Sequence, residues 1–294
     1  MKEAVFKGCA TALITPFTSD GVDYPALKRL VDFQLSEGVD AIVVCGTTGE
    51  ASTMSYIERM KTIETVVSQV NGRIPVIAGT GSNSTESVIS LSRDVSSLNV
   101  DALLVVTPYY NKATQTGLIR HYTTIADAVP RPIILYNVPS RTGVSCAAET
   151  YAALSSHPNI AGIKEASGNL ALVQKTRELC PVDFCIWSGN DDETAPIMLL
   201  GGIGVISVVS NVIPKQMTAL AHTCLSGNFK EAGQLQLSIR ALADVLFREV
   251  NPIPVKTALS MMGYCQPILR LPLCEMSQAN RTELADILKR YQLI

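Results

Sequence analysis

A lysine that closes an apolar segment is the residue whose chemistry stands out first. Lys164 follows Ile160-Ala-Gly-Ile163, and no other lysine ends a predicted strand of this chain. At the mouth of an apolar core a lysine loses solvation, which lowers its pKa toward neutrality. A neutral amine can attack a carbonyl carbon and form a Schiff base. Taken alone, the position is explained equally well by a lysine that reaches solvent or pairs with an acid.

Four further residues add chemistry to that amine. Tyr136 ends another apolar segment, and its phenol can transfer a proton. Thr47 and Thr48 lie between glycines, where N–H groups and hydroxyls can bind a carboxylate. Arg141 follows Tyr136 in a loop and can bind a second carboxylate through two hydrogen bonds. A rim aromatic, a tight turn and a surface salt bridge are the ordinary alternatives, but together the residues fit chemistry on a small 2-oxo acid.

Metal and disulfide chemistry are not indicated. The histidines, His121, His157 and His222, are far apart and have no ligand-like neighbours, so we expect no metal site. None of the eight cysteines forms a Cys-x-x-Cys pair, and several lie in apolar segments. We therefore expect reduced, buried thiols in a cytoplasmic protein.

Eight short apolar segments alternate with segments of helical periodicity. The predicted strands are 8–14, 41–45, 75–78, 102–106, 132–136, 161–164, 184–187 and 204–208. The predicted helices between them include 24–37, 55–70, 85–98, 117–128, 149–156 and 170–179. This alternation favours parallel strands with right-handed crossovers, and eight units predict an α/β protein with a closed (β/α)8 TIM barrel. An open doubly wound sheet is the alternative, but no Gly-x-Gly-x-x-Gly follows the first strand.

The predicted barrel would bring the candidate residues together. In such barrels the chemistry lies in the loops that leave the carboxyl ends of the strands. Small, hydroxylic and ionisable residues follow the predicted strands at 46–50, 79–83, 107–111, 136–143, 164–169 and 188–192. Residues 1–224 are the predicted barrel domain. Residues 225–294, with helices at 229–250, 255–263 and 278–291, are predicted as a C-terminal helical region that needs the barrel for stability.

Composition narrows the function further. The chain has 294 residues and a formal net charge of −2. It therefore lacks the surplus of basic residues that is typical of a nucleic-acid-binding protein. Charged residues are 17% and hydrophobic residues 47%, which favours a large core and buried subunit interfaces. Residues 194–214 carry no charge, but the glycine pair at 201–202 favours a turn between a helix and a strand. We therefore expect neither nucleic-acid binding nor a membrane segment.

Five motifs carry a resemblance that runs nearly end to end. They are Gly46-Thr-Thr-Gly-Glu50, Thr107-Pro-Tyr-Tyr-Asn111, Tyr136-Asn-Val-Pro-Ser-Arg-Thr-Gly143, Ile163-Lys-Glu-Ala-Ser-Gly168 and Asn251-Pro-Ile-Pro-Val-Lys256. In this order they resemble the dihydrodipicolinate synthase family of pyruvate-dependent, Schiff-base aldolases. The resemblance implies a (β/α)8 barrel with C-terminal helices, a homotetramer built as a dimer of dimers, and no cofactor besides the covalent imine of pyruvate on Lys164.

The resemblance also implies a reaction. Pyruvate would condense with L-aspartate 4-semialdehyde to 4-hydroxytetrahydrodipicolinate, in diaminopimelate and lysine biosynthesis. Tyr136, Thr47 and Tyr110 correspond to a proton relay in which Tyr110 comes from the neighbouring subunit. Thr48 lies where the family binds the pyruvate carboxylate, and Arg141 where it binds the carboxylate of the aldehyde.

Two further positions and one departure complete the resemblance. Gly189 and Ile206 match positions that line the pocket near the lysine. Lysine-inhibited family members bind lysine near the equivalent of Tyr109, beside polar residues that this chain replaces. The replacements are Tyr56, Arg59 and Ser87, while Asn83 and Tyr109 are retained. An arginine repels a lysine ligand, so we expect weak or absent inhibition by lysine.

Two other functions remain as alternatives. One is a sibling 2-oxo-acid aldolase that acts on N-acetylneuraminate or on 2-keto-3-deoxy sugar acids, and the other is a non-catalytic barrel that binds a 2-oxo acid. Arg141 suits a small carboxylated aldehyde, and Tyr110 completes the relay, which favours the synthase over the sibling aldolases. Loss of Lys164, Tyr136 or Arg141 would have pointed to the binding protein, and all three are present.

Overall fold

The structure, a computed structural model, describes residues 2–294. At its centre eight parallel strands form a closed barrel in the order β1-β10-β9-β8-β7-β6-β5-β4. They are β1 Gly8–Ala12, β4 Ala41–Val44, β5 Val76–Gly79, β6 Ala102–Val106, β7 Ile133–Asn137, β8 Ile160–Glu165, β9 Cys185–Ser188 and β10 Gly204–Ser207. Each overlaps one predicted strand, so the prediction of a (β/α)8 TIM barrel is confirmed.

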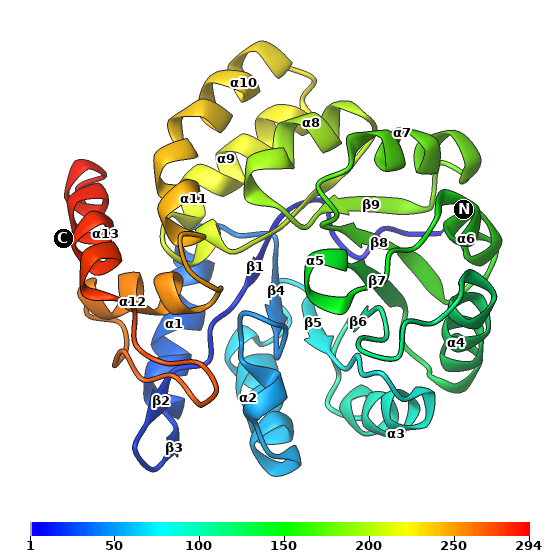
Figure 1. The fold of residues 1–294 in the computed structure, drawn as a ribbon, viewed down its shortest axis with the longest axis horizontal. Helices are drawn as coiled ribbons and strands as arrows, with labels where there is room; N and C mark the ends of the chain where they lie inside the picture. Colours follow the sequence, from blue (N-terminus) through cyan, green and yellow to red (C-terminus); the bar gives the residue numbers. More distant parts are fainter. Residues whose placement is uncertain (1) are drawn as a thin grey trace.

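Helices surround the barrel (Figure 1). They are α1 Tyr24–Ser36, α2 Tyr56–Val70, α3 Thr85–Ser96, α4 Gln115–Ala128, α6 Ala148–Ser155, α7 Leu170–Leu179, α8 Thr194–Leu199 and α9 Pro214–Leu225. Alternate residues of each strand face opposite sides of the sheet. In β4, Ile42 and Val44 pack in the layer between barrel and helices, whereas Ala41 and Val43 point into the barrel. Apolar residues on both faces explain why the strands gave continuous apolar segments.

Local rules account for the helix that follows β4. A short 3-10 helix, η1 Ala51–Thr53, leads into α2. The Ser55 hydroxyl accepts a hydrogen bond from the Glu58 N–H, and the Glu58 carboxylate accepts one from the Ser55 N–H at 2.9 Å. This reciprocal arrangement is the capping box that the Ser-x-x-Glu spacing predicts.

A hairpin and a single-turn helix are among the short elements that were not predicted. Residues 17–22 form an antiparallel hairpin of β2 Phe17–Thr18 and β3 Gly21–Val22. Pro139–Thr142, expected within a loop, forms the single-turn helix α5. Proline suits the first helical position, and Gly143 ends the turn with φ of 72°, a conformation that glycine adopts without strain. This turn holds Arg141 beside the carboxyl end of β7.

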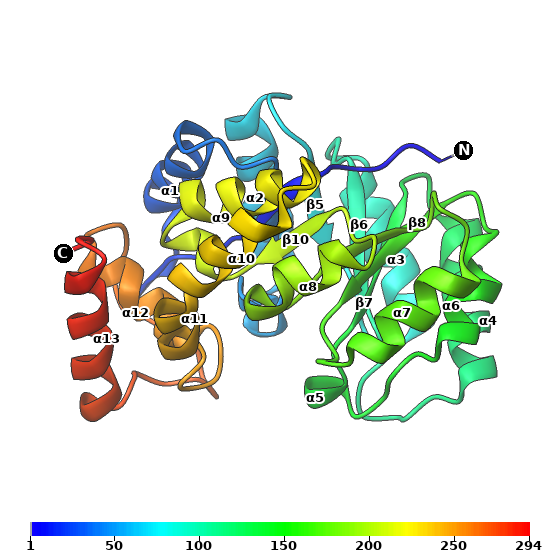
Figure 2. The same cartoon turned by 90° about the horizontal axis from the view of Figure 1, so that it is seen from above.

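The C-terminal region is helical, as expected, but one predicted helix was wrong. The expected helix 229–250 is divided into α10 Phe229–Ser238 and α11 Arg240–Leu246, with the break at the buried Ile239. The two parts pack on different neighbours, α10 on α8 and α9 and α11 on α13, which one straight helix could not do. The remaining helices are α12 Ile253–Met261 and α13 Gln278–Arg290, and they lie at one side of the barrel, away from the N-terminus (Figure 2).

The uncharged segment 194–214 contains three short elements. They are α8, β10 and the 3-10 helix η3 Val209–Asn211, with a turn at the glycine pair. Within residues 2–294, no helix has the length and apolar character needed to cross a membrane. All eight cysteines are free thiols; six are buried, Cys265 is half-buried and Cys274 is exposed.

Candidate active site

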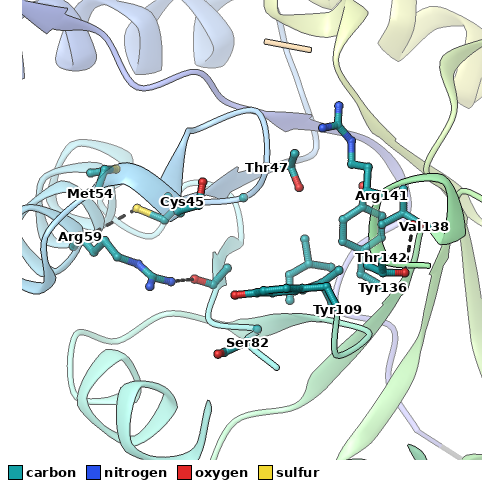
Figure 3. A pocket seen from close by; sticks show the side chains of 17 residues that line it. Cys45, Thr47, Met54, Arg59, Ser82, Tyr109, Tyr136, Val138, Arg141 and Thr142 are labelled. Atoms are coloured by element: carbon teal, nitrogen blue, oxygen red, sulfur yellow. Dashed lines mark hydrogen bonds between the residues drawn. The ribbon is translucent and has the colours of Figure 1, made fainter. Parts of the chain in front are cut away.

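Two adjoining cavities open at the carboxyl ends of the barrel strands. The smaller one, about 190 Å³, is lined by Lys164, Thr48, Gly189 and Asn251 among others, and we call it the lysine cavity. The larger one, about 370 Å³, extends toward η1 and α2 and is here the outer cavity (Figure 3). Both cavities are lined by the same six residues where they meet: Gly46, Thr47, Leu104, Tyr136, Val138 and Arg141. Six of the eight sequence-predicted residues therefore line one connected space: Thr47, Thr48, Tyr136, Arg141, Lys164 and Gly189.

Lys164 and Tyr136 lie side by side because of a shift in strand register. The pairing of β7 with β8 slips by one residue after Ile133, so that Lys164 lies directly opposite Tyr136. Both side chains then point into the barrel. The Lys164 Nζ atom lies 4.4 Å from the centroid of the Tyr136 ring. The structure thus places the predicted amine and the predicted phenol in contact.

Burial changes the acidity of both groups. Lys164 is only 6% exposed, and desolvation lowers its pKa to about 8, with the nearby Asp191 carboxylate opposing this shift and Arg141 adding to it. Desolvation raises the pKa of the Tyr136 phenol, while Arg141 and the Thr47 hydroxyl act in the opposite direction. At pH 7 about a tenth of Lys164 is therefore a neutral amine, which is the form that attacks a carbonyl.

The two threonines of the loop after β4 play different structural parts. Thr47 is exposed and lines both cavities, on the side that faces Tyr136 (Figure 3). Thr48 is buried and lines the lysine cavity alone. The hydroxyl of Thr48 accepts a hydrogen bond from Asn251 Nδ2 at 3.0 Å. That bond leaves the hydroxyl hydrogen of Thr48 free to donate to an anion in the cavity.

Asn251 is a site residue that the sequence analysis quoted in a motif without giving it a role. Its side chain binds Thr48, and its backbone carbonyl oxygen accepts a hydrogen bond from Arg141 Nη2 at 3.2 Å. Asn251 precedes α12, and so the C-terminal region supplies part of the cavity wall. An asparagine before a proline is a common turn sequence, and nothing in that pattern distinguishes a cavity residue from an ordinary turn.

Gly189 and Ile206 occupy different places. Gly189 lines the lysine cavity, and a Cβ atom there would lie 2.6 Å from the Ala166 Cβ and 3.1 Å from the Lys164 Cε. Ile206 is fully buried inside the barrel and lines neither cavity. The residue of this segment that lines the lysine cavity is Val208, which lies just beyond β10. Val208 has helical backbone angles, so strand alternation does not apply to it and did not point to it from the sequence.

Two buried carboxylates that the sequence analysis did not select support the site from outside the cavities. Glu165 lies outside the barrel and accepts hydrogen bonds from Asn137 Nδ2 at 3.0 Å and from the Tyr151 hydroxyl at 2.9 Å. Asp191, in the 3-10 helix η2 Asp191–Glu193, accepts hydrogen bonds from the Ser207 hydroxyl and from the Val208 N–H at 3.0 Å. These bonds tie β8 to β7 and the loop after β9 to β10, which fixes the strands that carry Lys164 and Tyr136.

A buried ion pair joins the loop that carries the threonines to the C-terminal helices. Lys256 of α12 donates to Glu50, and the side chains are 0% and 1% exposed. The second Glu50 oxygen accepts a hydrogen bond from the Arg270 N–H at 3.1 Å. Both cations lie over the ring of Phe17 in the unpredicted hairpin, with Lys256 Nζ 4.2 Å and Arg270 Cζ 4.3 Å from the ring centroid. Lys256 therefore stabilises the structure and does not enter either cavity.

Tyr110 does not lie in the cavities of its own chain. Its side chain is 89% exposed, with φ of 75°, and neither cavity includes it. Its neighbour Tyr109 lines the outer cavity together with Arg59, whose Nη2 donates to the Gly79 carbonyl oxygen at 3.0 Å. Any contribution of Tyr110 to catalysis must then come from a second chain or from a movement of its loop.

The fold and the site together define a class of protein: an enzyme built on a (β/α)8 barrel, with its site at the carboxyl ends of the strands. The model of the dihydrodipicolinate synthetase family matches residues 5–291. The chain therefore belongs to the dihydrodipicolinate synthetase family.

Individual relatives are similar over their whole length. The chain is 51% identical to a 4-hydroxy-tetrahydrodipicolinate synthase of Geobacter metallireducens, over 99% of this chain and 100% of that one. The crystal structure of dihydrodipicolinate synthase from Thermotoga maritima matches with a TM-score of 0.97 and 44% identity, covering 99% of this chain and 100% of the other. The chloride-inhibited dihydrodipicolinate synthase of Acinetobacter baumannii, solved in complex with pyruvate, matches with a TM-score of 0.96 and 42% identity over 98% and 99% of the two chains.

Proposed function

We propose that this chain condenses pyruvate with L-aspartate 4-semialdehyde to form 4-hydroxytetrahydrodipicolinate. The observation that carries the proposal is the buried amine of Lys164, with its pKa lowered to about 8, facing Tyr136 in a cavity at the mouth of the barrel. Relatives about half identical in sequence bear the name of this synthase, and one solved relative holds pyruvate. These similarities favour the synthase over the sibling aldolases and over a non-catalytic barrel.

The first half-reaction needs an amine and a proton carrier. The neutral Nζ of Lys164 attacks C2 of pyruvate, and loss of water gives the imine. Removal of a proton from C3 then converts the imine to an enamine. Tyr136 is the nearest phenol, and Thr47 lies beside it, so we assign proton transfer to these two hydroxyls. No cofactor takes part besides this covalent imine.

The second half-reaction forms the ring. The enamine carbon attacks the aldehyde carbon of the second substrate, and the new alkoxide takes a proton. The amino group of that substrate then attacks C2, which expels Lys164 as a free amine and closes the ring. We assign the pyruvate carboxylate to Thr48 and the carboxylate of the aldehyde to Arg141, because these donors line the lysine cavity at separate points.

The assembly and the compartment follow from the same assignment. We infer that Tyr110 completes the relay from a neighbouring subunit, because in its own chain it is 89% exposed. A homotetramer arranged as a dimer of dimers would supply that neighbour. We also treat residues 1–224 as the barrel domain and 225–294 as a helical region that completes the site through Asn251. Eight unpaired cysteines fit the reducing conditions of the cytoplasm.

Turnover of the two substrates is the direct test. Pyruvate and aspartate semialdehyde are supplied together, and the next reductase of the route reports product through nucleotide oxidation. We expect turnover by the wild-type chain and none by Lys164→Ala. Borohydride should trap pyruvate on the wild-type chain only. Trapping without turnover would support the Schiff base but indicate that the second substrate is that of a sibling aldolase. The absence of both trapping and turnover would favour a non-catalytic binding protein.

A further inference from the structure

The side chain of Asn251 has one polar atom that the protein leaves unused. Asn251 is 5% exposed and lines the lysine cavity. Its Nδ2 donates to Thr48, and its backbone carbonyl accepts from Arg141. Its side-chain oxygen Oδ1 is buried and accepts no hydrogen bond from any of residues 2–294. A buried amide oxygen without a donor costs free energy, so its retention in a cavity wall points to a donor that arrives with a ligand.

The charges around the cavity indicate which group of a ligand would donate a hydrogen bond to Asn251 Oδ1. Two cations, Lys164 and Arg141, line the lysine cavity, and no aspartate or glutamate among the described residues lines it. Both carboxylates of the proposed substrates therefore have donors. The second substrate also carries an α-ammonium group, which needs acceptors, and within this wall only neutral oxygens are available.

Among those neutral oxygens, the side-chain oxygen of Asn251 is the one placed to accept from the ammonium group. Its backbone carbonyl is bonded to Arg141, which we assign to the substrate carboxylate, and its side chain is bonded to Thr48. An α-ammonium lies one carbon away from its carboxylate, so a substrate held by Arg141 brings its nitrogen next to Asn251. The other amide that lines the cavity, Asn190, is less buried, and its Nδ2 donates to Glu193 at 2.8 Å.

We propose that Asn251 Oδ1 binds the α-amino group of the aldehyde substrate, so that Asn251 and Arg141 together recognise an α-amino-acid head group. This assignment rests on the proposed function and deepens it. It gives the lysine cavity a means of preferring an amino aldehyde over an aldehyde that has only a carboxylate. It also holds the nitrogen that must later attack C2 and close the ring.

The test compares two aldehydes that differ only in the amine. Aspartate semialdehyde is assayed by turnover, and succinate semialdehyde, which keeps the aldehyde and the carboxylate, by its inhibition constant. For Asn251→Leu we expect kcat/KM for aspartate semialdehyde to fall about 10- to 100-fold, the effect of one hydrogen bond to a charged group. The inhibition constant of succinate semialdehyde should change less than about 3-fold, because that ligand has no amine for Oδ1 to bind.

For each variant, comparing kcat/KM for aspartate semialdehyde with the inhibition constant of succinate semialdehyde separates a loss of amine recognition from general damage to the site. Asn251→Ala is the second variant, and Asn190→Leu is the matched control, for which the ratio of the two constants should stay at the wild-type value. Borohydride trapping of pyruvate by each variant reports a folded site. Equal losses for both aldehydes, or no loss for either, would overturn the role of Asn251 while leaving the synthase reaction intact. A wild-type chain that does not turn over aspartate semialdehyde would overturn both proposals.

Discussion

The reactivity of Lys164 is a consequence of where the side chain ends. Its ammonium group would be buried under the mouth of the barrel, where desolvation disfavours the charged form. With a pKa of about 8 in place of 10.5, the neutral fraction at pH 7 rises roughly 300-fold. Burial alone therefore supplies much of the activation of the nucleophile, without a dedicated base in contact with Nζ.

The pH dependence of imine formation follows from this shift. The folded-state pKa of Lys164 lies below its unfolded value, so the neutral, reactive amine accumulates as the pH rises toward 8. We expect the initial rate of imine formation with pyruvate to rise about tenfold per pH unit below this value and to level off above it. Quenching with borohydride and measuring the labelled mass at each pH gives the profile. A midpoint near 10.5 would show that Lys164 is not desolvated.

A substitution at Gly189 tests how much room the side chain of Lys164 needs. An alanine at this position brings a Cβ atom to 2.6 Å from Ala166 and 3.1 Å from the Lys164 side chain. Since Lys164 must move, we expect Gly189→Ala to slow imine formation by about 10- to 100-fold. Gly233→Ala is the matched control, because a Cβ there meets nothing within 4 Å. Unchanged trapping by Gly189→Ala would mean that Lys164 tolerates displacement.

Inhibition by lysine is also decided at single residues. Arg59 lines the outer cavity, and its guanidinium brings a positive charge where a lysine ligand would bring another. Tyr56 is directed elsewhere, because its hydroxyl donates to Asp94 at 3.0 Å. We therefore expect weak or absent inhibition when lysine is added to the turnover assay. Half-inhibition below about 1 mM, an affinity worth about 4 kcal/mol, would contradict the expectation.

At the scale of elements, the loop after β4 depends on contacts from distant parts of the chain. Glu50, which closes this loop, binds Lys256 of α12 and the backbone of Arg270. Both cations also contact the ring of Phe17 in the hairpin. Hairpin, loop and C-terminal helices are thus parts of one buried cluster. The cluster holds the loop that presents Thr47 and Thr48 to the cavities.

Breaking the ion pair should be costly because one charge would remain buried alone. We expect Lys256→Met to lower the free energy of unfolding by about 3–5 kcal/mol, measured by urea denaturation. The double variant Lys256→Met with Glu50→Gln should cost less than the sum of the single changes, since it leaves no unpaired charge. Lys175→Met removes the exposed pair with Glu149 and is the control, with an expected change under about 1 kcal/mol. Equal losses for Lys256 and Lys175 would refute a buried pair.

At the scale of the whole molecule, the cavity needs chain segments that lie far apart in sequence. The barrel supplies the amine and the phenol, and the C-terminal region supplies Asn251. Tyr110 faces solvent in the single chain, beside the exposed Tyr109. Two adjacent exposed tyrosines are typical of a protein interface. This arrangement fits a site that is completed only in an oligomer.

Mixed oligomers can show whether Tyr110 acts across an interface. Lys164→Ala and Tyr110→Phe chains are each expected to have little activity. Co-expressed chains that pair at random should recover about a quarter of wild-type turnover, because half the dimers carry one site with both wild-type residues. Recovery requires that Tyr110 serve the site of its neighbour. Activity no greater than that of the two parent variants would place Tyr110 in its own chain or outside the mechanism.

The architecture and the principal chemistry could be predicted from the pattern of residues along the chain. Eight apolar segments alternating with amphipathic ones left few alternatives to a parallel barrel, because strands buried on both faces need helices on their outer side. Lys164 and Tyr136 could be selected because each ends such a strand. The loops that carry Thr47 and Arg141 could be placed at the same end of the barrel for the same reason.

How these residues meet depends on the packing of the elements. The one-residue slip between β7 and β8 places Lys164 opposite Tyr136, and no local pattern in the sequence specifies such a slip. The break at Ile239 and the role of Asn251 depend on contacts with partners far away along the chain. Ile206 lies within β10 and lines neither cavity, whereas Val208, just beyond the end of the strand, lines the lysine cavity. Periodicity reports which face of an element is buried, whereas register, depth and long-range pairing arise only when the elements pack together.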